Sequence, residues 1–194
     1  MKNILALLSL FTCARAASQD SLQSFANTRN RTMLTGMKVL GSWGAANLAG
    51  GGIGWATATG SDKYFYQMST FWGGVNLGIA ALGISSAKRK MKQPLTADES
   101  VNAQKKLENI FLINAGLDLV YTGAGLYMKT RGDNKNNQTL QGYGSSVMLQ
   151  GIFLFVFDGV MYKLQRNNGN GLRKFLDKNS VAFDGKSIGL VHKW

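Results

Sequence analysis

The sequence predicts an all-α fold: a four-helix up-down transmembrane bundle that follows an N-terminal signal peptide and ends in a short basic C-terminal tail. Three observations lead to this prediction. Four long blocks carry almost no charge, glycine occurs 24 times beside a single proline, and two of the glycine-rich blocks share a repeated phrase. Glycine is costly inside soluble helices, whereas membrane helices use it to bring backbones close together.

The first residues have the pattern of an export signal. One lysine precedes the apolar core ILALLSLF, and Ala14 and Ala16 occupy the small-residue positions of a cleavage site. Because the apolar core is too short to cross a bilayer, we expect residues 1–16 to be removed. Residues 17–32 would then form an N-terminal segment ahead of the membrane domain. Removal would also take away Cys13, the sole cysteine of the chain.

Charge spacing defines four predicted spans in a membrane domain over residues 33–164. No charged residue occurs in residues 39–61 or in residues 64–87, and each of these two blocks exceeds the roughly 20 residues that cross a bilayer as a helix. The third block, residues 109–128, contains only Asp118 as a charged residue, and the fourth, residues 143–162, contains only Asp158. The predicted spans are residues 36–58, 64–87, 106–128 and 141–163.

The segments between the spans favour a simple up-down order. TGSDKY is a tight turn that makes the first two helices antiparallel neighbours. The next linker is long and basic, and Thr96 with Glu99, or else Ser100, provides a start for the third helix. In the basic tail, residues 165–194, the sequence DG lies between apolar residues and allows either a small hairpin or a disordered end.

A repeated phrase links the first two spans. SWGAANLAGGGIG and FWGGVNLGIAALG align at an offset of 29 residues, which pairs Trp43 with Trp72 and Asn47 with Asn76. Trp and Asn are four residues apart in both phrases and therefore lie on one helical face. Both asparagines fall near the middle of their spans, so antiparallel helices would bring them to a similar depth. We expect a carboxamide pair that fixes the register of a close-packed hairpin.

Small residues predict which helix faces approach each other. A row at four-residue spacing runs along the first span, and a shorter row runs along the second. The first row is Ala46, Gly50, Gly54 and Ala58, and the second is Gly74 and Gly78. Such rows let two backbones come nearly into contact, so we expect them to form the hairpin interface together with the tryptophans.

The third and fourth spans carry heavier polar side chains. Two stripes follow helical spacing, Asn114, Asp118 and Tyr121 in the third span and Gln150 and Asp158 in the fourth. A carboxylate in hydrocarbon is costly, so these residues should face the bundle interior and find partners. Lys38 is the expected partner of Asp158, because both lie on the same side of the membrane in an up-down bundle. For Asp118 two interpretations stay open, a structural polar core and a proton or ion path.

Catalytic and cofactor chemistry is not expected. The only histidine, His192, lies near the end of the chain, so neither a catalytic triad nor a histidine-rich metal site can be assembled. We therefore predict no enzyme activity, no cofactor and no metal. The net charge of +12 fits lipid headgroups better than nucleic acid, because the basic residues border apolar runs without a nucleic-acid-binding module. The expected partners are membrane lipids, with a membrane protein partner or a second copy as alternatives.

Two signals disagree about orientation. By the positive-inside rule, the basic linker and the basic tail should lie in the cytoplasm, and this topology also places the N-terminus in the cytoplasm. A cleaved signal peptide places the mature N-terminus outside. An outer-membrane barrel would avoid the conflict, but barrel strands need only about ten residues and the uncharged runs are far longer. An integral protein of the bacterial inner membrane is therefore favoured, with the outer membrane as the alternative.

Three phrases carry a family resemblance: FWGGVNLGIA, LENIFLINAGLDLVYTGAGLYM and LQGIFLFVFDGVMY. With them, residues 33–164 resemble an uncharacterised family of small four-helix bacterial membrane proteins of the Bacteroidota type. The resemblance implies four membrane helices and supplies no activity. We expect a structural or accessory subunit. The first alternative is a small ion, proton or solute translocator, and the second is a protein that binds lipid or another hydrophobic ligand.

Overall fold

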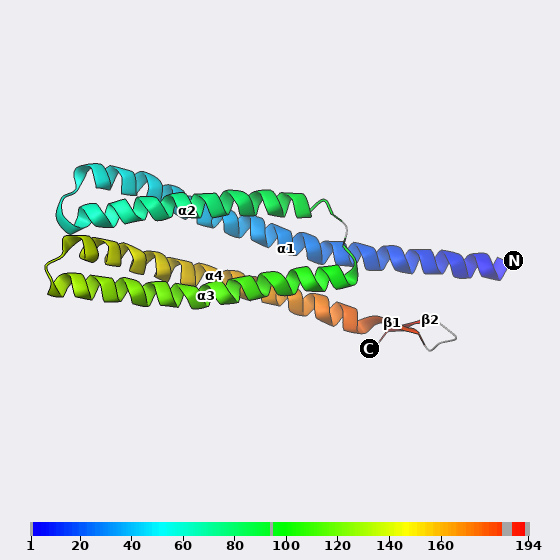
Figure 1. The fold of residues 1–194 in the computed structure, drawn as a ribbon. Coiled ribbons are helices and arrows are strands. Elements are labelled where there is room, and N and C mark those ends of the chain that lie inside the picture. The colour runs from blue at the N-terminus through cyan, green and yellow to red at the C-terminus, as the bar shows by residue number, and fades with distance from the viewer. Residues whose placement is uncertain (1, 94, 184–187, 193–194) are drawn as a thin grey trace.

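Four long helices make up most of the structure (Figure 1). The computed structural model describes residues 2–93, 95–183 and 188–192. The elements are α1 (Lys2–Thr57), α2 (Gly60–Lys90), α3 (Ala97–Asn134), α4 (Gln138–Lys178), β1 (Asn179–Phe183) and β2 (Ile188–His192). The prediction of four helices is confirmed, and each helix extends beyond its predicted span.

The helices form two antiparallel hairpins, α1 with α2 and α3 with α4 (Figure 1). Both hairpin turns lie at one end of the molecule, which we call the turn end. The α2–α3 connection, the N-terminus and the strands lie at the opposite end, which we call the linker end (Figure 1). Because α4 also packs against α1 and α2, it is the helix that joins the two hairpins.

Each hairpin turn is short and contains one residue in the left-handed conformation. In the α1–α2 turn this residue is Gly60, with φ 61°, a region that glycine enters without steric cost. In the α3–α4 turn, residues 135–137, it is Asn136, with φ 51°. Asparagine is one of the few other residues that adopt this conformation routinely. The tight turn expected from TGSDKY is therefore present.

The start of α3 is held by a capping box. The Thr96 hydroxyl accepts a hydrogen bond from the Glu99 backbone N–H at 3.3 Å, and the Thr96 backbone N–H donates to the Glu99 carboxylate at 2.9 Å. The Thr96 hydroxyl also donates to the Glu99 carboxylate at 2.9 Å, and the two bonds that the carboxylate accepts from Thr96 lower the pKa of the Glu99 carboxyl group. Of the two predicted starts, Thr96 with Glu99 is the one used, and Ser100 is buried inside α3.

The two ends of the chain differ most from expectation. Residues 17–32, expected as a separate segment, belong to α1, and α4 continues through the start of the expected tail to Lys178. β1 and β2 then pair antiparallel with Asn179 opposite His192, so the hairpin alternative is the observed one, and its DG sequence lies outside the described residues. Of the predicted signal peptide, residues 1–16, the described residues 2–16 belong to α1, and its cleavage stays a prediction.

Buried positions recur every seven residues along the helices. The seams are Asn30, Met37, Gly44 and Gly51 in α1; Gly73, Ala80 and Ala87 in α2; Gln104, Phe111, Asp118, Gly125 and Gly132 in α3; and Gly144, Gly151, Asp158, Gln165 and Leu172 in α4. A seven-residue repeat keeps one face of a slightly supercoiled helix toward its partner, as in a coiled coil. The seams run the length of the bundle and mix glycine, apolar and polar side chains.

The middle of the bundle has polar residues inside and apolar residues outside. Its buried polar side chains are Asn47, Ser69, Asn76, Asp118, Ser146, Gln150 and Asp158. The exposed large apolar side chains run from Val39 to Trp55 in α1, from Phe71 to Leu82 in α2, from Ile110 to Tyr127 in α3 and from Leu149 to Leu164 in α4, and we call the zone formed by these four stretches the apolar belt. Soluble proteins bury most such side chains, and a large exposed apolar surface marks contact with lipid or with another protein.

Among the described residues, two helices are long and apolar enough to cross a membrane. These are α3 and α4, judged by length and hydropathy. The exposed apolar side chains of α3 run from Ile110 to Tyr127. This stretch is about 27 Å long at about 1.5 Å per residue, close to the hydrocarbon thickness of about 30 Å. α1 and α2 are richer in glycine, alanine and hydroxyl residues, yet they also expose apolar side chains such as Ile53 and Leu82.

Candidate functional site

Each hairpin is held by a contact between two glycine backbones. In the first hairpin, a Cβ atom added at Gly73 would lie 2.8 Å from the Gly44 carbonyl oxygen and 2.5 Å from the Leu48 backbone nitrogen. In the second hairpin, a Cβ atom added at Gly125 would lie 2.8 Å from the Gly144 carbonyl oxygen. Close backbone approach of this kind is how helices associate where no hydrophobic effect drives them together.

A glycine–threonine contact accompanies each glycine pair. Gly51 packs against Thr70 in the first hairpin, and Gly151 packs against Thr122 in the second. Both threonine hydroxyls donate, at 2.8 Å, to the carbonyl four residues earlier in their own helix. The hydroxyls are thereby satisfied within the helix, and the two hairpins share the same two kinds of contact.

The predicted small-residue rows are only partly packing faces. Gly54 does pack, against the ring of Tyr66. Gly50, Gly74 and Gly78 face open space, because an added Cβ atom would meet nothing within 4 Å. The two glycines of α1 that approach the α2 backbone, Gly44 and Gly51, are seven residues apart. The expectation that Gly50, Gly74 and Gly78 pack at the hairpin interface is therefore wrong, because the rows at four-residue spacing lie partly on a neighbouring face of each helix.

The two tryptophans of the repeat make different contacts. Trp43 stacks on Phe153 of α4 with ring centroids 4.0 Å apart, and its Nε1 donates to Gln150 Oε1 at 2.8 Å. Trp72 meets Tyr121 of α3 edge to face, with centroids 5.7 Å apart. The repeat thus supplies one tryptophan to the α1–α4 contact and one to the α2–α3 contact, rather than two to the α1–α2 interface.

Three buried carboxamides meet in the apolar belt, and we call Asn47, Asn76 and Gln150 the carboxamide cluster. Gln150 Nε2 donates to Asn47 Oδ1 at 2.7 Å, and Asn76 Nδ2 donates to Gln150 Oε1 at 3.5 Å. Asn47 Nδ2 donates to the Trp43 carbonyl at 2.9 Å. The two asparagines are brought together as expected, but through Gln150 of α4 rather than by a direct bond. The cluster therefore ties the first hairpin to the second.

The two acids of the belt face each other. Asp118 of α3 and Asp158 of α4 are 3% and 5% exposed, and their carboxyl groups are close enough to interact through a hydrogen bond. Such a bond requires a proton on one of the two carboxyl groups, because a carboxylate can only accept. Lys38, the expected partner of Asp158, is exposed on the outward face of α1 and forms no ion pair within the described chain, so that expectation is wrong.

A groove of about 420 Å³ leads to this pair, and we call it the α2–α3 groove. Its lining comes mostly from α2 and α3, and it includes Asn76, Asn114, Asp118, Tyr121 and Asp158. Other lining residues, such as Ile79, Ile110 and Leu117, are exposed, so the groove opens on the surface of the apolar belt. Five of the residues expected in a polar core therefore line one groove.

The α2–α3 groove contains two buried acceptors without partners. Asn76 Oδ1 and Asp118 Oδ2 have no hydrogen-bond partner within the described chain. An unsatisfied buried acceptor costs about 1–3 kcal/mol, so it is commonly matched by water or a ligand. The arrangement is suited to bind a hydrogen-bond donor or a cation with an apolar body. Within the described chain, no three or more histidine, cysteine or acidic residues are grouped so that they could hold a metal ion.

A second polar cluster lies at the linker end and was not predicted from the sequence. Gln104 and Gln165 are fully buried, and Gln104 Nε2 donates to the Gln165 carbonyl at 2.6 Å. Gln165 Nε2 in turn donates to the Arg29 carbonyl at 3.2 Å, and Asn168 Nδ2 donates to Gln104 Oε1 at 2.9 Å. Gln165 and Asn168 lie in the segment that was assigned to the tail, Arg29 lies in the expected N-terminal segment, and Gln104 lies in the linker before the third predicted span. The seven-residue seam through Asp158 and Gln165 is the signal that would have found them.

Charged residues extend the linker-end cluster. The buried carboxylate of Glu108 accepts hydrogen bonds from Arg166 at 2.9 Å and from Arg173 at 3.3 Å. The hydrogen bond and charge of Glu108 raise the pKa of Arg166. Arg29 is buried and its Nη1 donates to the Ser100 carbonyl at 3.2 Å, while burial lowers its pKa. The cluster fixes the extended ends of α1 and α4 to α3.

The fold and its buried side chains define a class of protein: a four-helix bundle of two glycine-packed hairpins with a polar centre and an apolar exterior. Residues 39–159 match a family of unknown function (DUF6992), and since the match covers more than half of the chain, the protein belongs to this family. The resemblance to an uncharacterised family is thus confirmed. The matched segment contains the carboxamide cluster and both belt acids. The chain matches no curated protein and no solved structure.

Proposed function

We propose that the protein is an integral membrane protein and that all four helices cross the bilayer within the apolar belt. The distribution of side chains in the apolar belt supports this proposal, because it is the reverse of the distribution in soluble proteins. Polar residues are buried and large apolar residues are exposed, as suits a lipid solvent. Helix contacts through paired glycine backbones are a further feature of membrane helices. The signal-peptide pattern and the charge distribution lead us to propose an inner-membrane location with residues 1–16 removed, and the family resemblance implies a bacterial envelope of the Bacteroidota type.

Within this bundle, we propose that the α2–α3 groove binds the cationic or hydrogen-bond-donating group of an amphiphilic ligand. The observation that supports it is the pair of buried, unpartnered acceptors, Asn76 Oδ1 and Asp118 Oδ2, on two residues that line a groove with exposed apolar residues. A donor or cation placed there would satisfy both oxygens and would interact with the Asp118–Asp158 pair. The apolar body would lie against side chains such as Ile79 and Leu117. No catalytic role, cofactor or nucleic-acid partner is part of this proposal.

A translocator of protons or small cations is the second candidate, because intramembrane acids often mark ion paths. The contact between Asp118 and Asp158 favours it, since two acids that share a proton can release or take up one. The α2–α3 groove would give a proton or cation access to the two acids from the lipid-facing side, but a translocator also needs a path onward from them. Binding of a ligand requires only the groove, so we rank ligand binding first.

Reaction with a carbodiimide tests the proposed site. Dicyclohexylcarbodiimide dissolves in lipid and modifies protonated carboxyl groups, so it should label Asp118 or Asp158 in membranes, while Asp118→Asn should remove most of this labelling. Asp133 is the matched control because it is exposed at the turn end in an ion pair with Lys129, and only a water-soluble carbodiimide should reach it. Peptide mass spectrometry measures the labelling of the acid pair and the labelling of Asp133. Dodecylamine, a cation with an apolar tail, should protect the pair, and dodecanoate should not.

The outcomes separate the candidates. Labelling of the acid pair that dodecylamine leaves unchanged would contradict ligand binding and favour a proton path. Absence of labelling in both membranes and detergent would contradict the open groove itself. An accessory subunit, the remaining candidate, predicts a third pattern. A partner helix in the α2–α3 groove would shield the acids in native membranes, and labelling would appear only after the protein is purified in detergent.

A further inference from the structure

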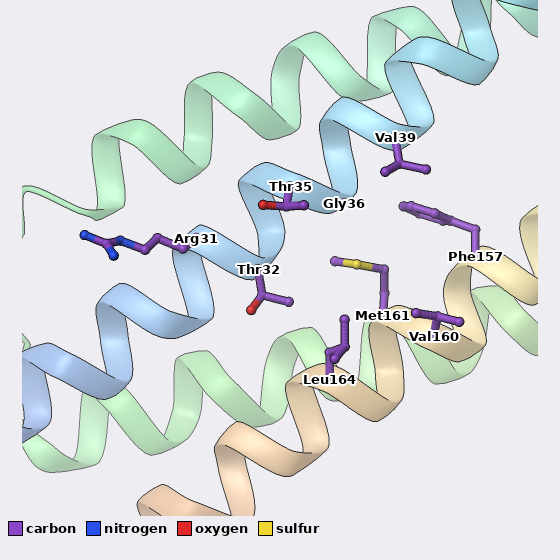
Figure 2. Close-up of a pocket in the computed structure, with 9 residues that line it drawn as sticks. All are labelled: Arg31, Thr32, Thr35, Gly36, Val39, Phe157, Val160, Met161 and Leu164. Carbon is purple, nitrogen blue, oxygen red and sulfur yellow. The ribbon is translucent and has the colours of Figure 1, made fainter.

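A separate groove between α1 and α4 has a polar end and an apolar body (Figure 2). We call it the α1–α4 groove, and its volume is about 370 Å³. Arg31, Thr32 and Thr35 form the polar end, and Val39, Phe157, Val160 and Leu164 form most of the apolar body. Val39 and Leu164 are also the first and last residues of the apolar belt, so the groove crosses the edge of the belt at the linker end.

The polar end contains hydrogen-bond donors without partners. Arg31 is exposed and, unlike Arg29 or Arg166, makes no ion pair or hydrogen bond within the described chain. Its side chain extends away from the apolar residues, toward the N-terminal part of α1 (Figure 2). The hydroxyls of Thr32 and Thr35 likewise have no hydrogen bond among the described residues. Other hydroxyls of the bundle, such as those of Thr70 and Thr122, donate to a carbonyl of their own helix.

The apolar body has a closed bottom and open walls. Gly36 forms the bottom with Met161, because the Met161 thioether occupies the space where a side chain at Gly36 would lie (Figure 2). The walls Val39, Val160 and Leu164 are 50%, 53% and 48% exposed. No acidic residue lines the groove, and the acidic residue Asp20 lines a separate pocket that Arg31 also borders.

We propose that the α1–α4 groove binds an anionic phospholipid. The phosphodiester accepts hydrogen bonds from the Arg31 guanidinium and from the Thr32 and Thr35 hydroxyls, and an acyl chain lies along Val160 and Leu164. A guanidinium is suited to phosphate because its donors form a planar fork that can bond two oxygens at once. The position also fits, since headgroups lie just outside the hydrocarbon zone and the polar end lies just outside the apolar belt. This proposal rests on the proposed membrane insertion.

Native mass spectrometry of the full chain in mild detergent tests this proposal. Dioleoyl phosphatidylglycerol should bind about tenfold more tightly than dioleoyl phosphatidylcholine, and Arg31→Gln should weaken phosphatidylglycerol binding by about tenfold. The matched control is Lys38→Gln, which removes the same charge on the same helix but lies outside the groove. It should change binding by less than about twofold. Arg31 is exposed and has no partner in the described chain, so we expect both variants to fold.

Several results would overturn the proposal. Equal binding of the two lipids would show that headgroup charge has no role. Equal losses of phosphatidylglycerol affinity in Arg31→Gln and Lys38→Gln would show a general attraction between the basic protein and anionic lipid rather than a site at Arg31. Competition by soluble glycerol 3-phosphate at the same concentration as the lipid would show that the apolar wall contributes nothing. A dimer that Arg31→Gln dissociates would assign the groove to a second copy. Failure of membrane insertion is distinguishable, because the wild-type protein would then stay dispersed without detergent.

Discussion

Replacement of Gln150 by leucine should destabilise the folded bundle by about 2–3 kcal/mol, because it leaves several buried polar groups without partners. Gln150 accepts from Trp43 and Asn76 and donates to Asn47, so it is the common member of all bonds between the two hairpins in the carboxamide cluster. Leucine has a similar volume and adds apolar contact, so the loss should reflect hydrogen bonding rather than a cavity. Unfolding in mixed micelles, followed by circular dichroism, measures this change.

Gln138→Leu is the matched control for this substitution. Gln138 is exposed at the first turn of α4, and its replacement should change the free energy of unfolding by less than about 0.5 kcal/mol. Trp43 fluorescence gives a second readout, since its indole N–H loses its acceptor only in Gln150→Leu. Equal stability of the two variants would show that the carboxamide cluster does not hold the hairpins together.

Gly73→Ala should destabilise the first hairpin by about 2–3 kcal/mol, although it adds a single methyl group. The new Cβ atom would meet the backbone of Gly44 and Leu48, so α1 and α2 would have to separate. Gly74→Ala is the control on the next residue. Its Cβ atom would face open space, and alanine is the better helix former by about 0.5–1 kcal/mol, so this variant should be more stable than the wild type.

The two glycine variants are therefore expected to have effects of opposite sign. Thermal or detergent unfolding of both proteins under the same conditions is sufficient to compare them. If Gly73→Ala were as stable as Gly74→Ala, the backbone contact between α1 and α2 would not exist in the folded protein.

The helices and their connections were readable from the sequence because they depend on local signals. Long uncharged runs predicted the four helices, and the Thr96–Glu99 pattern predicted the start of α3, where the capping box is observed. The helix ends could not be predicted, because an uncharged run reports the length of the apolar belt and not the length of the helix. α1 and α4 continue into polar sequence, where Gln165 and Arg29 hold them together.

The pairing of polar side chains depended on information that spacing alone does not contain. The shared depth of Asn47 and Asn76 was expected from the repeat, but the bridge through Gln150 depends on how the second hairpin docks. Similarly, a charge argument paired Asp158 with Lys38, whereas the seams of α3 and α4 bring it to Asp118. The glycine faces were misjudged because a four-residue spacing was preferred to the seven-residue seam.

Nitroxide labels in the reconstituted protein test whether the apolar belt lies in lipid, as we propose. In a Cys13→Ser background, the substitutions Leu119→Cys and Asn102→Cys each provide one thiol for a nitroxide label. Both positions are exposed on α3, residue 119 inside the apolar belt and residue 102 outside it. Power-saturation electron paramagnetic resonance compares collisions with oxygen, which enters lipid, and with a water-soluble nickel chelate. Oxygen should dominate at residue 119 and the chelate at residue 102. Dominance of the chelate at both positions would contradict membrane insertion.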